Sequence, residues 1–175
     1  MPNTYTLIAS NTLSTATASV TFSSIPATYT DLLVKISARN TGSEINGIVY
    51  VQPNASTSNL SGRLLYGTGS AAGSATYTSD PAIWGYCCGD TSTASTFSNS
   101  EFYIPNYAGS TYKSISVDSV SENNATDARA SLMAGLWSDT TAITSLKFLT
   151  ADNSAFASKN FKQYSTFYLY GIKNS

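Results

Sequence analysis

The stretch YSTFYLYGI, residues 164–172, decides the fold class. In an extended chain, successive side chains point to opposite faces, so Phe167 and Leu169 share one face. Tyr168 and Tyr170 share the other. Both faces are apolar, which is typical of a central strand that is covered on both sides. The alternative is an exposed aromatic platform for stacking sugars or bases. We predict a core strand, and a second copy of the chain is the expected cover for any face left open.

Alternation with a period of two recurs in ten further short runs, separated by Gly, Pro, Asn, Asp and Ser. These runs cover residues 4–10, 18–22, 31–39, 47–51, 62–67, 82–88, 100–107, 112–120, 130–137 and 144–150. Many short strands at this spacing are the pattern of a sandwich or a barrel. The sequence therefore predicts an all-β fold, a single domain over residues 1–175 that is a sandwich or a barrel.

The composition supports a folded β protein. Ser and Thr make up about three residues in ten, and charged residues only 11 %, against about 25 % in ordinary globular domains. Disorder is excluded because hydrophobic residues reach 42 %, aromatic residues 12 %, and the net charge is only −1. Thr, Val, Ile, Tyr and Phe are the residues that suit a pleated, half-buried surface.

One segment is open to two interpretations, and two others are predicted to be loops. Residues 122–137 contain fair helix formers, but the alternation of Leu132 and Leu136 with Met133 favours a turn followed by a strand. Residues 53–62 and 67–81 are predicted to be long loops. Loops longer than about 12 residues are usually functional or mobile.

Charge and hydropathy restrict the partners. The nine cations are spread from Lys35 to Lys173 without a cluster, so no nucleic acid partner is expected. No apolar run approaches the ~18 residues of a membrane helix, and no signal peptide is visible at the start, so we expect no membrane partner and folding in a cytoplasm. Cys87 and Cys88 should then stay reduced and serve as small apolar residues in a strand.

The sequence offers little catalytic chemistry. The absence of histidine removes Ser-His-Asp catalysis and imidazole metal sites, and no phosphate-binding or calcium loop occurs. Paired carboxylates, chosen from Glu101, Asp118, Glu122 and Asp127, are the remaining catalytic device. Acids in Ser-rich turns usually cap or stay solvated, so we expect no enzyme, no metal and no cofactor.

Several segments resemble parts of a known group of proteins. They are SIPATYTDLLVKISAR, FYIPNYAGS, SVSENNATDA, AGLWSDTTAITSLKF and QYSTFYLYGIKNS. In order, they are similar to segments of small structural proteins encoded by tailed phages of marine and freshwater bacteria. The resemblance covers residues 5–175 and is weakest over residues 53–98. It is most specific in ENNATDA and in YSTFYLYGIKN.

This resemblance implies a component of the virion, made in the host cytoplasm. Jelly rolls and related sandwiches are common in virion components, so the resemblance also implies that the single domain is a jelly-roll-like β-sandwich. Within that class we predict a non-catalytic capsid cement or decoration protein, a homotrimer that also contacts the major capsid protein or another virion protein. The alternative is a tail or head fibre or spike module that binds host surface glycans. Its contact residues would be Tyr77, Trp84 and Tyr86, in or near the loop over residues 67–81.

Overall fold

The computed structural model describes residues 4–124 and 126–173, and over these residues it contains thirteen strands and no helix. None of the described residues forms a helix that could cross a membrane. The strands are β1 (Tyr5–Thr12), β2 (Ser19–Phe22), β3 (Asp31–Ser37), β4 (Asn46–Pro53), β5 (Leu60–Gly67), β6 (Ala72–Tyr77), β7 (Trp84–Cys88), β8 (Asn99–Pro105), β9 (Lys113–Ser121), β10 (Arg129–Trp137), β11 (Leu146–Asp152), β12 (Ser158–Lys159) and β13 (Thr166–Ile172).

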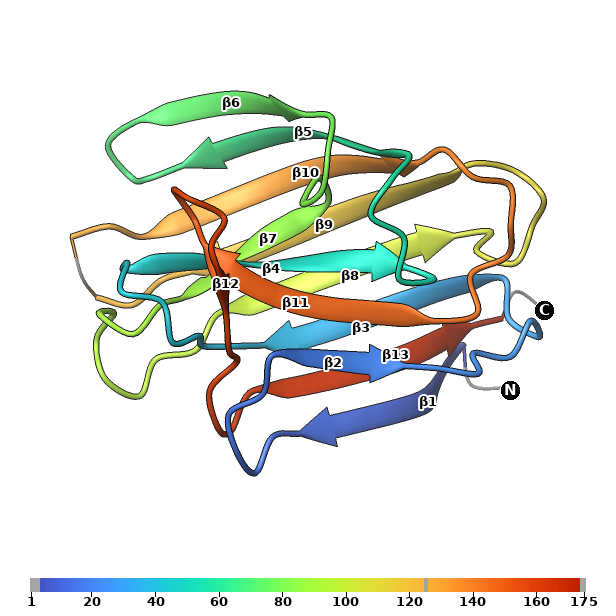
Figure 1. Ribbon diagram of the computed structural model, residues 1–175, viewed down its shortest axis with the longest axis horizontal. Helices are drawn as coiled ribbons and strands as arrows, with labels where there is room; N and C mark the ends of the chain where they lie inside the picture. The colour runs from blue at the N-terminus through green and yellow to red at the C-terminus, as the bar shows by residue number, and fades with distance from the viewer. Residues whose placement is uncertain (1–3, 125, 174–175) are drawn as a thin grey trace.

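These strands form two antiparallel sheets, with the small sheet in front of the large one in Figure 1. The large sheet has eight strands in the order β1-β13-β3-β8-β9-β10-β5-β6. The small sheet has the order β12-β11-β4-β7, and β2 also pairs with β11. The all-β prediction is confirmed, and the two sheets are consistent with a single β-sandwich. A jelly-roll connectivity in particular is not established by this strand order.

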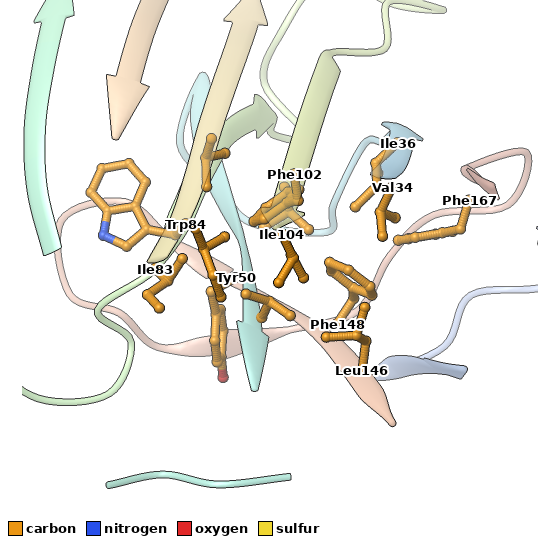
Figure 2. Packing of buried hydrophobic residues seen from close by; sticks show 14 of the residues in the cluster. Val34, Ile36, Tyr50, Ile83, Trp84, Phe102, Ile104, Leu146, Phe148 and Phe167 are labelled. Carbon is orange, nitrogen blue, oxygen red and sulfur yellow. The ribbon is translucent and has the colours of Figure 1, made fainter. Parts of the chain in front are cut away.

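The core lies between the two sheets, as Figure 2 shows. Phe148 of β11 stands at its centre, with ring centroids 5.4 Å from Phe102 of β8 and 6.1 Å from Phe167 of β13. Val34 and Ile36 of β3 pack into the same layer and are almost completely buried. As the alternation predicts, Val34 and Ile36 of β3, Phe102 of β8 and Phe167 of β13 all point toward the small sheet.

The terminal stretch forms β13, which pairs with β1 on one side and β3 on the other. Phe167 and Leu169 are 0 % exposed, so the prediction of a core strand is confirmed. Tyr168 and Tyr170 are only half-buried. Within the described residues only the inner face of β13 is covered by a second layer, so cover of the outer face by another copy stays a prediction.

Two strands, β6 and β12, were not predicted from the sequence. Residues 67–81 were predicted to be a loop, but they contain β6, which pairs with β5 along its whole length. Its sequence, AGSATY, is poor in the large side chains that mark a strand. The other is β12, which has only two residues. Residues 129–137 form a strand rather than a helix, as predicted. Cys87 and Cys88 are free and buried, also as predicted.

Candidate functional site

The three residues proposed to contact glycans come together in the folded chain. Trp84 and Tyr86 lie on β7, and Tyr77 ends β6. The ring of Trp84 makes edge-to-face contacts with Tyr77, at a centroid distance of 5.4 Å, and with Tyr86, at 5.1 Å. Tyr66 and Phe156 complete this aromatic cluster, with centroids 6.4 Å from Tyr86 and Trp84 respectively.

The aromatic cluster is closed to ligands. Trp84 and Tyr86 are 1 % and 4 % exposed, and burial raises the pKa of Tyr86 to about 12. Both lie on the face of β7 opposite Gly85, which faces Val117 and Ser119 of the large sheet. The aromatic cluster is thus part of the hydrophobic core, and Tyr66, Tyr77 and Phe156 pack against it. Neither ring offers a face to a sugar, and Tyr77 is itself half-buried.

The four candidate acids do not form one site. Glu101 and Asp118 are opposite each other on β8 and β9, but Glu101 forms an ion pair with Lys35 at 2.8 Å. Asp127 pairs with Arg129 at 3.0 Å, and Glu122 accepts a hydrogen bond from the backbone N–H of Asn124. Among the described residues, no group of three Asp, Glu or Cys side chains could hold a metal ion.

The outer face of the large sheet carries an exposed apolar patch at one end. We call it the β5–β10 patch, and its members are Leu65, Val120, Leu132 and Leu136. Leu65 and Leu132 are directly opposite in the pairing of β5 with β10, and they are 62 % and 60 % exposed. Val120 of β9 and Leu136 of β10 are also exposed. Each of these side chains alternates with a buried neighbour on its own strand.

A second apolar group, which is only partly exposed, lies at the other end of the same face. We call it the β1–β13 patch: Tyr5, Leu7, Leu33, Tyr168 and Tyr170. Leu7 of β1 and Leu33 of β3 both pair with Tyr170. Leu33 is buried, whereas Tyr5 and Leu7 are 56 % and 51 % exposed.

The centre of the outer face is polar. Lys35, Glu101 and Asp118 stand side by side across β3, β8 and β9. The hydrogen bond from Lys35 to Glu101 raises the pKa of Lys35. Exposed serines of β9 occupy the positions beside them. The face therefore has two apolar ends and a charged middle, a distribution that can bury area against a protein while fixing its orientation.

The sequence of residues 130–137 itself indicates an exposed apolar face. In residues 130–137, Leu132 and Leu136 alternate with Met133 and Trp137, so both faces of the strand are apolar. Only one of those faces can point at the single inner layer. The other must be exposed or covered by another molecule.

No protein-family model matches this chain, and a search of curated proteins finds no match.

Proposed function

We propose that this protein is a non-catalytic structural component of a phage virion, a capsid decoration protein that acts as a homotrimer. The observation that carries the proposal is the outer face of the large sheet. It carries six of the eight exposed large hydrophobic residues described, and the other two, Tyr112 and Tyr164, lie in loops. Apolar patches on otherwise polar surfaces mark sites of association.

The low charge supports the same role. An obligate contact buries about 2,000 Å² or more, and such a contact is weakened by desolvated, unpaired charge. Charged residues make up only 11 % of this chain, and on the outer face Lys35 is already paired with Glu101. We propose that the outer face of the large sheet contacts both other copies of the chain and the major capsid protein. Jelly rolls and related sandwiches are common in virion components. We propose that the sandwich of this protein is of the jelly-roll type.

The β5–β10 patch gives the most direct biochemical test. Leu132→Glu places a carboxylate at the centre of the patch. Leu132 is 60 % exposed, so the expected cost to the monomer is the repulsion from Asp118, which is opposite it on β9, of about 0.2–1 kcal/mol. Thr57→Glu, in the exposed loop between β4 and β5, is the matched control. Light scattering coupled to size exclusion should give a trimer for the wild type and the control, and a smaller species for Leu132→Glu. A wild-type monomer would refute self-association.

The role in the virion needs a second test. Virions lacking this protein should adsorb to host cells normally but burst more readily under heat or osmotic shock. Normal robustness combined with lost adsorption would overturn the decoration role and favour the fibre or spike alternative.

A further inference from the structure

An open groove lies among four loops at one end of the sandwich. This is the end at which β8 and β13 begin in Figure 1. The four loops are those that follow β1, β3, β7 and β12, and the groove between them has a volume of about 770 Å³. We call it the loop-end groove. It has the size of a small-ligand pocket, and none of its lining residues belongs to the patches of the outer face.

The walls of the loop-end groove are held by one buried cation. Arg39 is 6 % exposed, and its guanidinium donates hydrogen bonds to the backbone carbonyls of Asp90, Ser92, Thr93 and Thr96, at 2.8–3.1 Å. These bonds fix the loop between β7 and β8. Because the guanidinium is already bound to carbonyl oxygens, Arg39 acts as a positioning residue and not as a binding site for an anion.

The same arginine holds the opposite wall through its backbone. Its N–H donates to the hydroxyl of Ser165 at 3.2 Å, and its carbonyl accepts from the N–H of Lys162 at 2.7 Å. The N–H of Tyr164 donates to the carbonyl of Leu13 at 2.8 Å, which ties in the loop after β1. Together with the side-chain bonds of Arg39, these contacts connect all four loops, and the groove is preorganised before any ligand arrives.

Two of the nine described non-glycine residues with a positive φ line the loop-end groove. Tyr164 has a φ of 72° and Ser95 has a φ of 63°, values that a bulky side chain adopts rarely. Strain of this kind tends to be found at functional sites. Tyr164 is also 66 % exposed, the largest exposure among the large hydrophobic residues described. A strained backbone thus holds an exposed aromatic ring at the rim of the groove.

The remaining lining is nearly neutral and rich in hydroxyls. Asp90 and Lys162 form an ion pair, and the hydrogen bond from Lys162 lowers the pKa of the Asp90 carboxyl. The exposed amide of Gln163 and the hydroxyls of Thr15 and Ser95 add donors and acceptors on both sides. A ligand that suits such a surface offers many hydroxyls, no net charge, and an apolar face for a tyrosine ring.

We propose that the loop-end groove binds a neutral saccharide unit, with Tyr164 as the stacking ring and Asp90, Lys162 and Gln163 as hydrogen-bonding groups. This inference does not depend on the decoration role. It also places the glycan contact away from the buried aromatic cluster of Tyr77, Trp84 and Tyr86.

The test uses the full chain on an array of neutral and acidic oligosaccharides, with inorganic phosphate titrated separately as an anion probe. Binding of at least one neutral oligosaccharide is expected, with little change on adding salt, since no net charge drives it. Binding restricted to phosphate or to acidic glycans, or no glycan binding, would overturn the proposal.

Tyr164→Gly separates a binding role from a structural one. Glycine adopts a positive φ without strain, so the variant should unfold at the wild-type temperature or above while its saccharide affinity falls about tenfold or more. Tyr112→Ala is the control, because Tyr112 is 59 % exposed in the loop between β8 and β9, and its affinity should equal that of the wild type. Wild-type affinity in Tyr164→Gly, or an equal loss in both variants, would contradict the assignment.

Discussion

Arg39→Met tests whether one buried cation organises an end of this sandwich. Methionine retains most of the aliphatic length of arginine but has no hydrogen-bond donor. The variant removes the hydrogen bonds to four backbone carbonyls of residues 90–96. The hydrogen bonds that the backbone of Arg39 makes with Ser165 and Lys162 remain possible, so the change acts on one wall of the loop-end groove.

The expected loss of stability follows from those bonds. A hydrogen bond to a charged group contributes about 1.5–3 kcal/mol, which would give a large total for four of them. Two effects reduce this sum. Water can reach some of the freed carbonyls, because the neighbouring residues Asp90, Thr93 and Ala94 are exposed. In the wild type, desolvation of the guanidinium also destabilises the folded state by several kcal/mol, as for any buried ion, and Arg39→Met removes this penalty. We therefore expect a net loss of about 2–4 kcal/mol in the free energy of unfolding.

Urea denaturation measures this loss, and hydrogen exchange locates it. The amides of Ser92, Thr96 and Ser98, which are bonded within this loop or to Ala38, should exchange faster in Arg39→Met, while those of β9 stay protected. Arg63→Met is the matched control, because Arg63 is exposed on β5 and its side chain bonds only the adjacent carbonyl of Gly62 among the described residues. Its effect should lie within about 0.5 kcal/mol. Equal effects of the two variants, with unchanged exchange in the loop, would refute the reasoning.

Three further predictions concern the core. Phe167→Ala should destabilise the protein by about 3–5 kcal/mol in urea denaturation, since the ring is 0 % exposed; a loss below about 1 kcal/mol would mean that β13 is not a core strand. Gly171→Ala should lower the unfolding temperature, because its Cβ would lie 2.3 Å from the ring of Tyr29 and such overpacking costs about 1–3 kcal/mol; an unchanged temperature would contradict this contact. Burial raises the pKa of Cys87 to about 12, so a thiol reagent at pH 8 should label Cys87 only after unfolding, and rapid labelling of the folded protein would contradict its burial.

Most of the fold could be predicted from local alternation. In β9 and β10 every second residue is buried, and the sequence shows that period directly. The strand β6 was missed because Ala, Gly and Ser carry little hydrophobic signal, although its exposure alternates too. Its place in the sheet depends on pairing with β5, a contact that composition does not encode.

The candidate sites were harder to predict, because they depend on which elements cover each face. Trp84 and Tyr86 are aromatic residues next to a predicted loop. The rings of Tyr77 and Phe156 pack against Trp84, and the ring of Tyr66 packs against Tyr86. A strict alternation over residues 31–39 would place Arg39 on the same face as Lys35, which is exposed. The strand ends at Ser37, and the chain then turns so that Arg39 bridges to Cys88. Contacts of this kind join segments about fifty residues apart and leave no local pattern.

The position of this protein in a reconstruction of the virion tests the central claim most directly. The account predicts trimeric density on the capsid shell, with the outer face of the large sheet, including Leu65, Leu132 and Tyr5, buried against other copies or the shell. Density at the tip of a tail or head fibre, with that face exposed to solvent, would contradict it.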